Sequence, residues 1–139
     1  MDFVHFLSSH LLDPSQGGKA LYRDTVEQAV QAEALGYMGV GIPEHHLVNL
    51  LLIPSPLQMA VKIAAHTKEI KLMTSVCQLP LRDMRLFAGE VVQAQCLCDG
   101  RLMLGVGMGR SALRPGGSAC RWPRPRRGLT RRWRCWRRC

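Results

Sequence analysis

The sequence predicts an α/β fold over residues 1–110, in which four strands alternate with three helices. Short apolar runs bounded by glycine or proline recur along this region, and between them apolar residues follow one another at helical spacing. Strands that are separated by helices form right-handed βαβ units and therefore a parallel sheet. Two architectures fit this order, a doubly wound sheet and the first half of a TIM (β/α)8 barrel, and periodicity alone does not separate them.

The first strand is expected at residues 4–7, where a short apolar run stands. A loop over residues 9–18 follows, because a proline and two consecutive glycines interrupt regular structure there. The next segment is predicted to be helical, since four residues share one face: Tyr22, Val26, Ala29 and Val30. Leu35-Gly36 ends this helix, because glycine adopts the left-handed cap conformation without steric cost. Residues 38–42 are short, apolar and followed by a proline, which is typical of a buried strand.

The cycle of helix and strand then repeats twice. Ser55-Pro56 predicts a helix start, with serine as the N-cap and proline at the first helical position. The apolar stripe of this helix consists of Leu57, Ala60, Val61 and Ala64. Residues 70–76 are the third strand candidate. A further stripe predicts the third helix, which Asp99-Gly100 stops: Phe87, Val91, Ala94 and Cys98. Residues 102–106 form the fourth predicted strand.

The charge pattern divides the chain near residue 110. Residues 1–110 contain nine Lys or Arg and ten Asp or Glu, whereas residues 111–139 contain ten Arg, no Lys and no acid. The net charge of +9 at pH 7 therefore originates in the second segment alone. Because a globular domain mixes charges of both signs over its surface, residues 1–110 are expected to fold and residues 111–139 to form a disordered Arg/Trp/Cys-rich tail.

The composition of this tail is that of GC-rich codons read out of phase. All three Trp and three of the six Cys lie in it. A shift of one nucleotide would convert its Arg/Trp pairs mainly into Ala and Leu, which are strong helix formers. We therefore expect residues 111–139 to be a frameshift product. The alternative is an arm that binds nucleic acid or an anionic membrane surface, but its Trp residues show no amphipathic order, so nucleic-acid binding is not favoured.

Other features restrict the class of protein. The chain opens without a basic secretory n-region, and the apolar run at residues 47–53 is shorter than the about 20 residues that a membrane span needs. The cysteines lack the paired spacing of a zinc site, so reduced thiols and no metal site are expected. These observations favour a cytoplasmic protein without membrane association.

Three consecutive polar residues, Glu44, His45 and His46, follow the second predicted strand directly. In both α/β architectures the carboxyl ends of the strands carry the functional site, because the connecting loops converge there. Imidazole and carboxylate groups at that place could supply a general base or a hydrogen-bond donor. The alternative is a polar loop whose histidines pack as structure. A metal would need three or more ligands, and no third convergent histidine is evident.

The fourth predicted strand runs into a glycine-rich turn. Backbone N–H groups in such a turn can approach a phosphate, and the candidate residues are Gly107, Gly109 and Arg110. The spacing differs from the dinucleotide fingerprint and no acid follows, so a nicotinamide cofactor is not favoured. Cys77 ends the third strand and is interpreted as a small buried hydrophobe rather than a nucleophile.

Several short segments stand in a recognisable order along residues 1–110. They are AEALGY at 32–37, GIPEHH at 41–46, SPL at 55–57, AAHT at 64–67, IKL at 70–72, LP at 79–80 and GRLMLGVGMG at 100–109. Each is common by itself, but the series resembles the bacterial luciferase-like, flavin-dependent monooxygenase family. The resemblance implies a TIM barrel, reduced FMN as the cofactor that activates O2, and oxygenation of a small organic substrate. A separate flavin reductase is implied as the source of the reduced flavin.

The resemblance also assigns roles to individual residues. His45 matches the histidine that the family places beside the flavin as a catalytic residue, and Glu44 and His46 match its neighbours. Three residues match the strand end where the isoalloxazine ring packs, often over a non-proline cis peptide bond: Thr74, Ser75 and Val76. The family often has arginine where this chain has Met108, and Arg110 would be a shifted substitute for it in holding the flavin phosphate.

The length of the chain limits these implications. A complete (β/α)8 barrel needs about 250 residues, so residues 1–110 would be its N-terminal half. The chain is therefore expected to be a truncated member of the family and to be inactive as a fragment. An open half barrel leaves two strand edges and its inner face without partners, and a homodimer that pairs two halves is expected to cover them.

Overall fold

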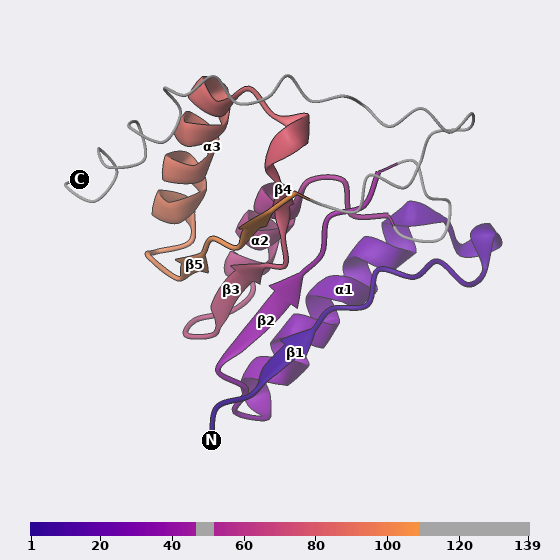
Figure 1. Cartoon of the computed structure of the whole chain (residues 1–139). Helices are drawn as coiled ribbons and strands as arrows, with labels where there is room; N and C mark the ends of the chain where they lie inside the picture. Colours follow the sequence, from indigo (N-terminus) through magenta and orange to yellow (C-terminus); the bar gives the residue numbers. More distant parts are fainter. Residues whose placement is uncertain (47–51, 109–139) are drawn as a thin grey trace. The chain divides into compact units, whose positions relative to one another are not determined.

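Four strands form a parallel sheet in the order in which they occur along the chain (Figure 1). The computed structural model describes residues 1–46 and 52–108. The strands of this sheet are β1 (Val4–Phe6), β2 (Gly39–Ile42), β3 (Lys71–Thr74) and β5 (Leu102–Met103). Phe6 pairs with Gly41, Gly41 with Met73, and Met73 with Met103. This register places all four residues on the same face of the sheet.

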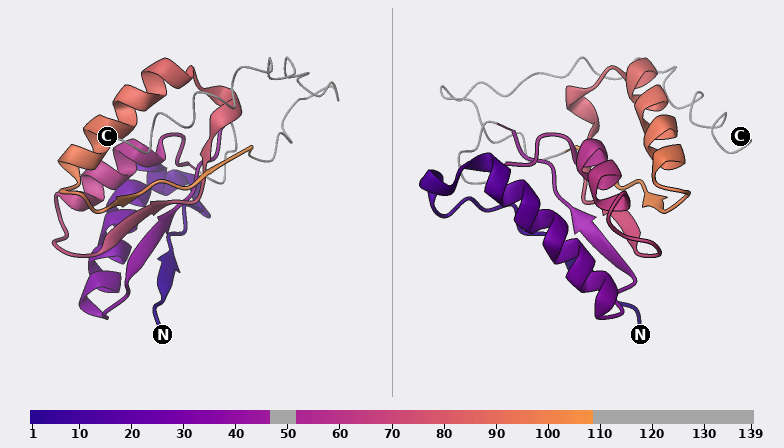
Figure 2. Two further views of the ribbon diagram at one scale, coloured as in Figure 1. Left: turned by 60° about the vertical axis from the view of Figure 1, so that its left-hand side comes forward. Right: turned by 180° about the vertical axis from the view of Figure 1, so that it is seen from behind.

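The helices lie on the other face (Figure 2). They are α1 (Gly17–Ala34), α2 (Pro56–Ala64) and α3 (Met84–Leu97), with the short 3-10 turns η1 (Pro14–Gln16) and η2 (Leu79–Leu81). Successive helices touch, α1 against α2 and α2 against α3. A doubly wound sheet reverses its strand order and carries helices on both faces. Sequential strands with helices on one face are the arrangement of a (β/α)8 barrel, so the predicted partial barrel is confirmed.

The core lies between the sheet and the helices. Val40, Ile42 and Leu72 are fully buried on the helix side of β2 and β3. The helices contribute residues that their apolar spacing predicted, mainly Val26, Ala29, Ala60, Ala64, Phe87, Val91 and Ala94. The stripe of α1 is the exception, because Tyr22 and Val30 are both exposed. The Tyr22 hydroxyl instead donates to the carbonyl oxygen of Leu52, which joins α1 to the segment before α2.

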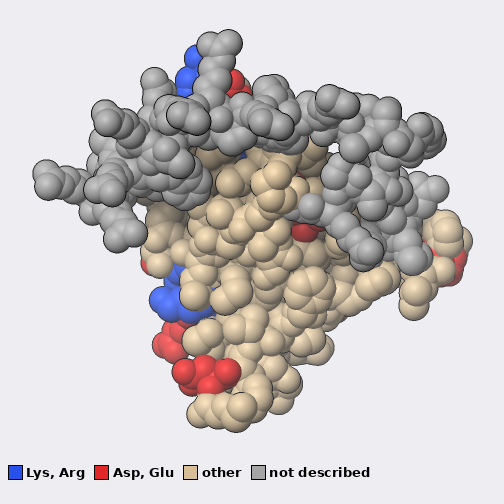
Figure 3. All heavy atoms as spheres, viewed as in Figure 1, with Lys and Arg blue, Asp and Glu red and all other residues tan. Residues whose placement is uncertain are grey.

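The face of the sheet that turns away from the helices is apolar and exposed. Phe6 is 57 % exposed and Met103 is 40 % exposed, and the neighbouring Phe3, Val4 and Leu104 are exposed as well. Charged side chains are sparse on the described part of this face (Figure 3). In a closed barrel this surface is the inner wall, where side chains from all strands meet. Its exposure follows from the small number of strands.

The helices α1 and α3 end at the glycines that the sequence predicted as cap residues. Gly36 after α1 has a φ of 79°, and Asp99 and Gly100 after α3 have φ values of 52° and 74°. Ser55 occupies the N-cap position of α2, but its side chain makes no capping hydrogen bond. The helix α1 begins at Gly17, inside the predicted loop. The reason is η1, whose N-cap Asp13 accepts from the N–H of Ser15 and which runs directly into α1.

The third and fourth predicted strands are each divided in two. β3 ends at Thr74, and β4 (Cys77–Gln78) follows after a cis peptide bond between Ser75 and Val76. β5 is likewise followed by β6 (Val106–Gly107), and β4 and β6 form a separate parallel pair. The sequence predicted continuous strands at residues 70–76 and 102–106 because both stretches are rich in apolar residues. The composition of a short stretch does not show where two neighbouring strands separate, so the two breaks could not be predicted.

A single side chain joins the strands where they diverge. The Thr74 hydroxyl donates to the carbonyl oxygen of Gly105 at 2.8 Å and accepts from the Gly105 N–H at 2.9 Å. The Cys77 N–H donates to the same carbonyl oxygen at 2.8 Å. These contacts satisfy backbone groups that would otherwise lose their strand partners.

The amino end of the sheet is fastened by an ionised side chain. The Glu33 carboxylate, near the end of α1, accepts hydrogen bonds from the backbone N–H groups of Lys68, Glu69 and Ile70 at 2.7 to 3.1 Å. Burial raises the pKa of this carboxyl group, but these three N–H donors and the charge of Arg101 outweigh burial and hold its pKa below the usual glutamate value. Glu33 therefore ties α1 to the segment that enters β3.

None of the helices in the described ranges combines the length and the apolar composition that crossing a membrane requires.

Candidate active site

Three chain segments meet at the carboxyl ends of the strands. The Ser75 N–H donates to the carbonyl oxygen of Ile42 at 2.8 Å, which joins the end of β3 to the end of β2. Val76 packs against Gly107, since a Cβ on that glycine would lie 2.9 Å from a Val76 methyl carbon. The Gln78 N–H reaches the carboxylate of Glu44 at 3.1 Å. The structure thus brings Glu44, Ser75, Val76 and Gly107 together from distant parts of the sequence.

Glu44 is the most connected residue of the site. Its side chain has no exposed surface. One carboxylate oxygen, Oε1, lies 2.6 Å from Nε2 of His46, and the other, Oε2, accepts from Nη2 of Arg82 at 2.7 Å and from the N–H of Gln78. The Gln78 side chain also donates to the backbone carbonyl oxygen of Glu44 at 2.9 Å. Both carboxylate oxygens are therefore engaged within the protein.

Arg82 compensates the buried charge of Glu44, and the sequence analysis did not identify it. Its side chain is 16 % exposed, and its guanidinium carbon lies 4.8 Å from the centre of the Phe87 ring. A buried carboxylate is stable only when a cation or several donors offset the loss of hydration. Arg82 stands between η2 and α3, and nothing in the local sequence marks it as the partner of a residue 38 positions earlier.

The two histidines differ in their surroundings. The His46 side chain is 36 % exposed and is held at Nε2 by Glu44. The His45 N–H donates to the carbonyl oxygen of Ile53 at 2.8 Å, and its ring is half-buried. Among the described residues, no side-chain hydrogen bond of His45 is present, so its ring remains available to a ligand.

The three residues predicted to pack against a flavin ring also differ. Thr74 is 1 % exposed, and its hydroxyl is used by the Gly105 backbone. Ser75 and Val76 are half-buried, and the peptide bond between them is cis, as the family resemblance led us to expect. A ligand at this strand end would therefore meet Ser75 and Val76, while Thr74 supports them from within.

The glycines after β5 have a packing role. A Cβ on Gly105 would lie 2.1 Å from the carbonyl oxygen of Thr74, so no larger residue fits there. Gly107 is needed for a similar reason, its contact with Val76. Gly109 and Arg110, which the sequence analysis placed at a phosphate, lie outside the described residues. The glycine-rich pattern thus reflects close approach of two strands at its first two positions.

Cys77 is completely buried, as expected for a small hydrophobic side chain. Burial raises the pKa of its thiol, which keeps the sulfur protonated and unreactive.

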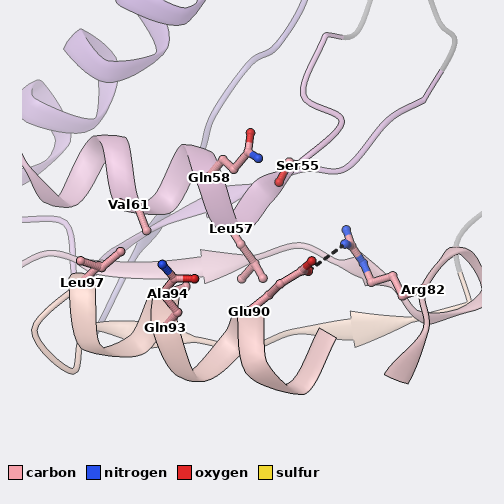
Figure 4. A pocket seen from close by; sticks show the side chains of 9 residues that line it. All are labelled: Ser55, Leu57, Gln58, Val61, Arg82, Glu90, Gln93, Ala94 and Leu97. Atoms are coloured by element: carbon pink, nitrogen blue, oxygen red, sulfur yellow. Dashed lines mark ion pairs between the residues drawn. The ribbon is translucent and has the colours of Figure 1, made fainter. Parts of the chain in front are cut away.

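A cavity of about 460 Å³ lies between α2 and α3 (Figure 4). Its lining consists of Ser55, Leu57, Gln58, Val61, Arg82, Glu90, Gln93, Ala94 and Leu97. None of the sequence-predicted site residues is among them. Arg82 forms one end of this cavity, where its Nη1 lies 4.0 Å from the Glu90 carboxylate, and the same guanidinium reaches Glu44.

Comparison with known proteins identifies the family. The model of the luciferase-like monooxygenase family matches residues 1–133. The oxygenase component of the flavin-dependent trigonelline monooxygenase of Acinetobacter baylyi is 28 % identical over 109 residues, which are 78 % of this chain and 30 % of that protein. Limonene 1,2-monooxygenase of Rhodococcus erythropolis is 30 % identical over 112 residues, 81 % of this chain and 29 % of that protein.

A solved structure shows the same fold. The oxygenating constituent of 3,6-diketocamphane monooxygenase of Pseudomonas putida, in complex with FMN, superposes with a TM-score of 0.73 at 24 % identity. The alignment covers 79 % of this chain and 30 % of that structure. The chain thus spans about a third of the length of the relatives it matches. From the family match and the shared barrel topology, the chain belongs to the luciferase-like monooxygenase family, whose matched relatives include flavin-dependent enzymes.

Proposed function

We propose that this chain is the N-terminal part of a flavin-dependent monooxygenase that oxygenates a small organic substrate with O2 and reduced FMN. Two relatives support the cofactor, since one is named flavin-dependent and another is solved with FMN. The former is described as an oxygenase component, which supports a separate reductase as the source of reduced flavin. The chain would contribute one wall of the active site, and the rest of the barrel would complete it.

The convergence of His45, His46 and the Ser75-Val76 segment at the carboxyl ends of β2 and β3 carries this proposal. Parallel α/β folds bind their ligands at this edge. The inner face beside it is apolar, with Phe6 and Met103 exposed, and suits a flat ring system. Imidazole rings beside an apolar wall can bind a flat ring system and exchange a proton with it.

The described residues would divide the work as follows. Ser75 and Val76 would support the isoalloxazine ring, and Phe6 would help to exclude water from it. His45, whose side chain makes no hydrogen bond to any residue that the structure describes, would donate or accept a proton beside the ring. Reduced FMN, when bound, would supply the electrons that activate O2. Gly107, Gly109 and Arg110 remain the candidates for the phosphate.

Flavin binding tests this function without requiring turnover. We expect the chain to quench FMN fluorescence saturably in an equilibrium titration. His45→Ala should weaken binding by about tenfold, which corresponds to about 1.4 kcal/mol. His66→Ala is the matched control, because His66 is an exposed histidine at the far end of α2 and should leave the affinity unchanged. Absence of saturable quenching, or equal effects of the two substitutions, would contradict the proposal.

A further inference from the structure

The two oxygens of the Glu44 carboxylate have partners of different kinds. Oε2 receives a hydrogen bond from Nη2 of Arg82 at 2.7 Å and another from the backbone N–H of Gln78 at 3.1 Å. An arginine and a backbone N–H have no lone pair to offer, so both partners can only donate. Oε1 faces Nε2 of His46 at 2.6 Å. An imidazole nitrogen either donates or accepts, depending on the tautomer.

The orientation of the carboxylate is fixed from two sides. The Gln78 backbone holds Oε2 while the Gln78 side chain holds the Glu44 carbonyl oxygen at 2.9 Å. Arg82 is itself held by its position over the Phe87 ring. Because the Glu44 side chain has no exposed surface, water cannot replace any of these partners. The carboxylate therefore presents an acceptor to His46 and cannot rotate to present anything else.

These contacts determine where the hydrogen of the His46 ring must lie. A carboxylate next to an arginine is stable in its ionised form, and an ionised carboxylate only accepts hydrogen bonds. The short contact between Oε1 and Nε2 is then satisfied only if Nε2 carries the hydrogen. In the neutral ring, Nδ1 is left with its lone pair.

We propose that Glu44 is a positioning residue, which fixes the ring proton of His46 on Nε2 and leaves Nδ1 as the proton acceptor of the site. The catalytic role of Glu44 rests on the proposed function, whereas the tautomer of His46 follows from the contacts of Glu44 alone. His46 would accept a hydrogen bond through Nδ1 from an O–H or N–H group of the bound flavin or substrate. If Nδ1 takes that proton, the resulting imidazolium is stabilised by the Glu44 carboxylate, as in other carboxylate–histidine pairs.

Glu44→Gln tests this assignment, because it should move the ring proton of His46 from one nitrogen to the other rather than only remove a contact. Arg82 and the Gln78 N–H both require an oxygen, so the amide oxygen of the new side chain should take the place of Oε2. Its NH2 group would then face Nε2 of His46, which must accept. The ring proton should move to Nδ1. We expect the ring to change from the Nε2–H to the Nδ1–H tautomer in ¹⁵N NMR, recorded without flavin and above the pH range in which imidazoles titrate.

The chain contains an internal reference. His66 Nδ1 lies 2.9 Å from the carbonyl oxygen of Lys62, which can only accept. His66 should therefore carry its proton on Nδ1 in both proteins, opposite to His46 in the wild type. Arg82→Lys is the second variant, since it keeps a cation beside the ionised carboxylate that faces His46 and should retain the Nε2–H tautomer. It also decides the question if Glu44→Gln does not fold.

Two results would overturn the proposal: an Nδ1–H ring at His46 in the wild-type chain, or an unchanged tautomer in folded Glu44→Gln. Loss of the Nε2–H tautomer in folded Arg82→Lys would also overturn it, because an ionised Glu44 carboxylate would then not be sufficient to fix the ring proton. None of these measurements involves FMN. A failed flavin titration would therefore contradict the proposed function and leave the tautomer assignment unchanged. A wrong tautomer would in turn contradict the role of Glu44 and leave the proposed function unchanged.

Discussion

At the residue scale, the site depends on how individual side chains are satisfied rather than on their types alone. Glu44 stands in the sequence as a candidate acid or base beside two histidines. In the structure its two oxygens are occupied by Arg82, Gln78 and His46. A carboxylate with this many partners orients its neighbours instead of exchanging protons with a ligand. His45 and His46, which are both half-buried, remain the groups that we propose for proton transfer.

Replacing glycine by alanine should change the stability of the protein in opposite directions at two described positions, Gly105 and Gly89. Gly105→Ala places a Cβ 2.1 Å from the Thr74 carbonyl oxygen, and backbone would have to move. We expect a loss of several kcal/mol in the free energy of unfolding, or failure to fold. Gly89→Ala is the matched control, because nothing lies within 4 Å of its Cβ position in α3. It should stabilise the protein by about 0.5–1 kcal/mol through helix propensity.

Urea denaturation followed by circular dichroism measures both glycine variants. Equal midpoints for Gly105→Ala and the wild type would show that the strands are not as close as the structure places them.

At the element scale, the partial barrel is fastened at both ends of its sheet by hydrogen bonds to charged side chains. Glu44 and Arg82 join the loop after β2 to the turn η2. Glu33 joins α1 to the start of β3, and Arg101, just before β5, donates to the carbonyl oxygen of Ala64 at the end of α2. These contacts connect elements that are not neighbours in the sequence, so they set how the βα units stack.

The Glu33 contact gives the stability a defined dependence on pH. The pKa of Glu33 is lowered in the folded chain, so its contribution is fully present above its unfolded pKa of about 4.3 and is lost as the pH falls through the folded value. Glu33→Gln should cost about 2 kcal/mol at pH 7, since hydrogen bonds to a charged group are being replaced. The difference from wild type should shrink below pH 4.

Urea denaturation of the wild type and of Glu33→Gln across this pH range provides the measurement. Glu27→Gln is the control on the same helix, because within residues 1–46 and 52–108 the Glu27 carboxylate pairs with Arg23 alone, at 3.8 Å on the surface. A difference between wild type and Glu33→Gln that stayed constant with pH would refute the role of the ionised carboxylate.

At the scale of the whole molecule, the open inner face determines how the chain behaves in solution. Phe6 and Met103 are exposed on a sheet face that a complete barrel would enclose. We expect the chain to self-associate through this face, which is the homodimer that the half-barrel interpretation predicts. Phe6→Asp should shift the population toward monomer, because it places a charge within the apolar surface.

Light scattering coupled to size-exclusion chromatography reports this equilibrium. Leu35→Asp is the matched control, since Leu35 is 77 % exposed at the end of α1, away from the sheet face. A monomeric wild type, or equal dissociation by both substitutions, would exclude this surface as the interface.

The sequence by itself determined the local features of this protein. Apolar spacing placed three helices and most of their core residues, with Tyr22 and Val30 of α1 as exceptions, and Gly36 and Asp99-Gly100 marked helix ends with positive φ. It also placed Glu44, His45 and His46 at a strand end, and the order of its motifs identified the luciferase-like family, which the family match confirms. These features depend on residues within a few positions of one another, so a short stretch of sequence is enough to predict them.

Only the tertiary structure decided what depends on distant residues. The choice of a barrel over a doubly wound sheet required the strand order, and the division of two strands required the Thr74 contact with Gly105, 31 positions away. Arg82 became part of the site only because the fold brings it to Glu44. The physical reason is that a buried charge or backbone polar group loses its hydrogen bonds to water. It is stable only if the fold brings a partner to it, and that partner can come from any part of the chain.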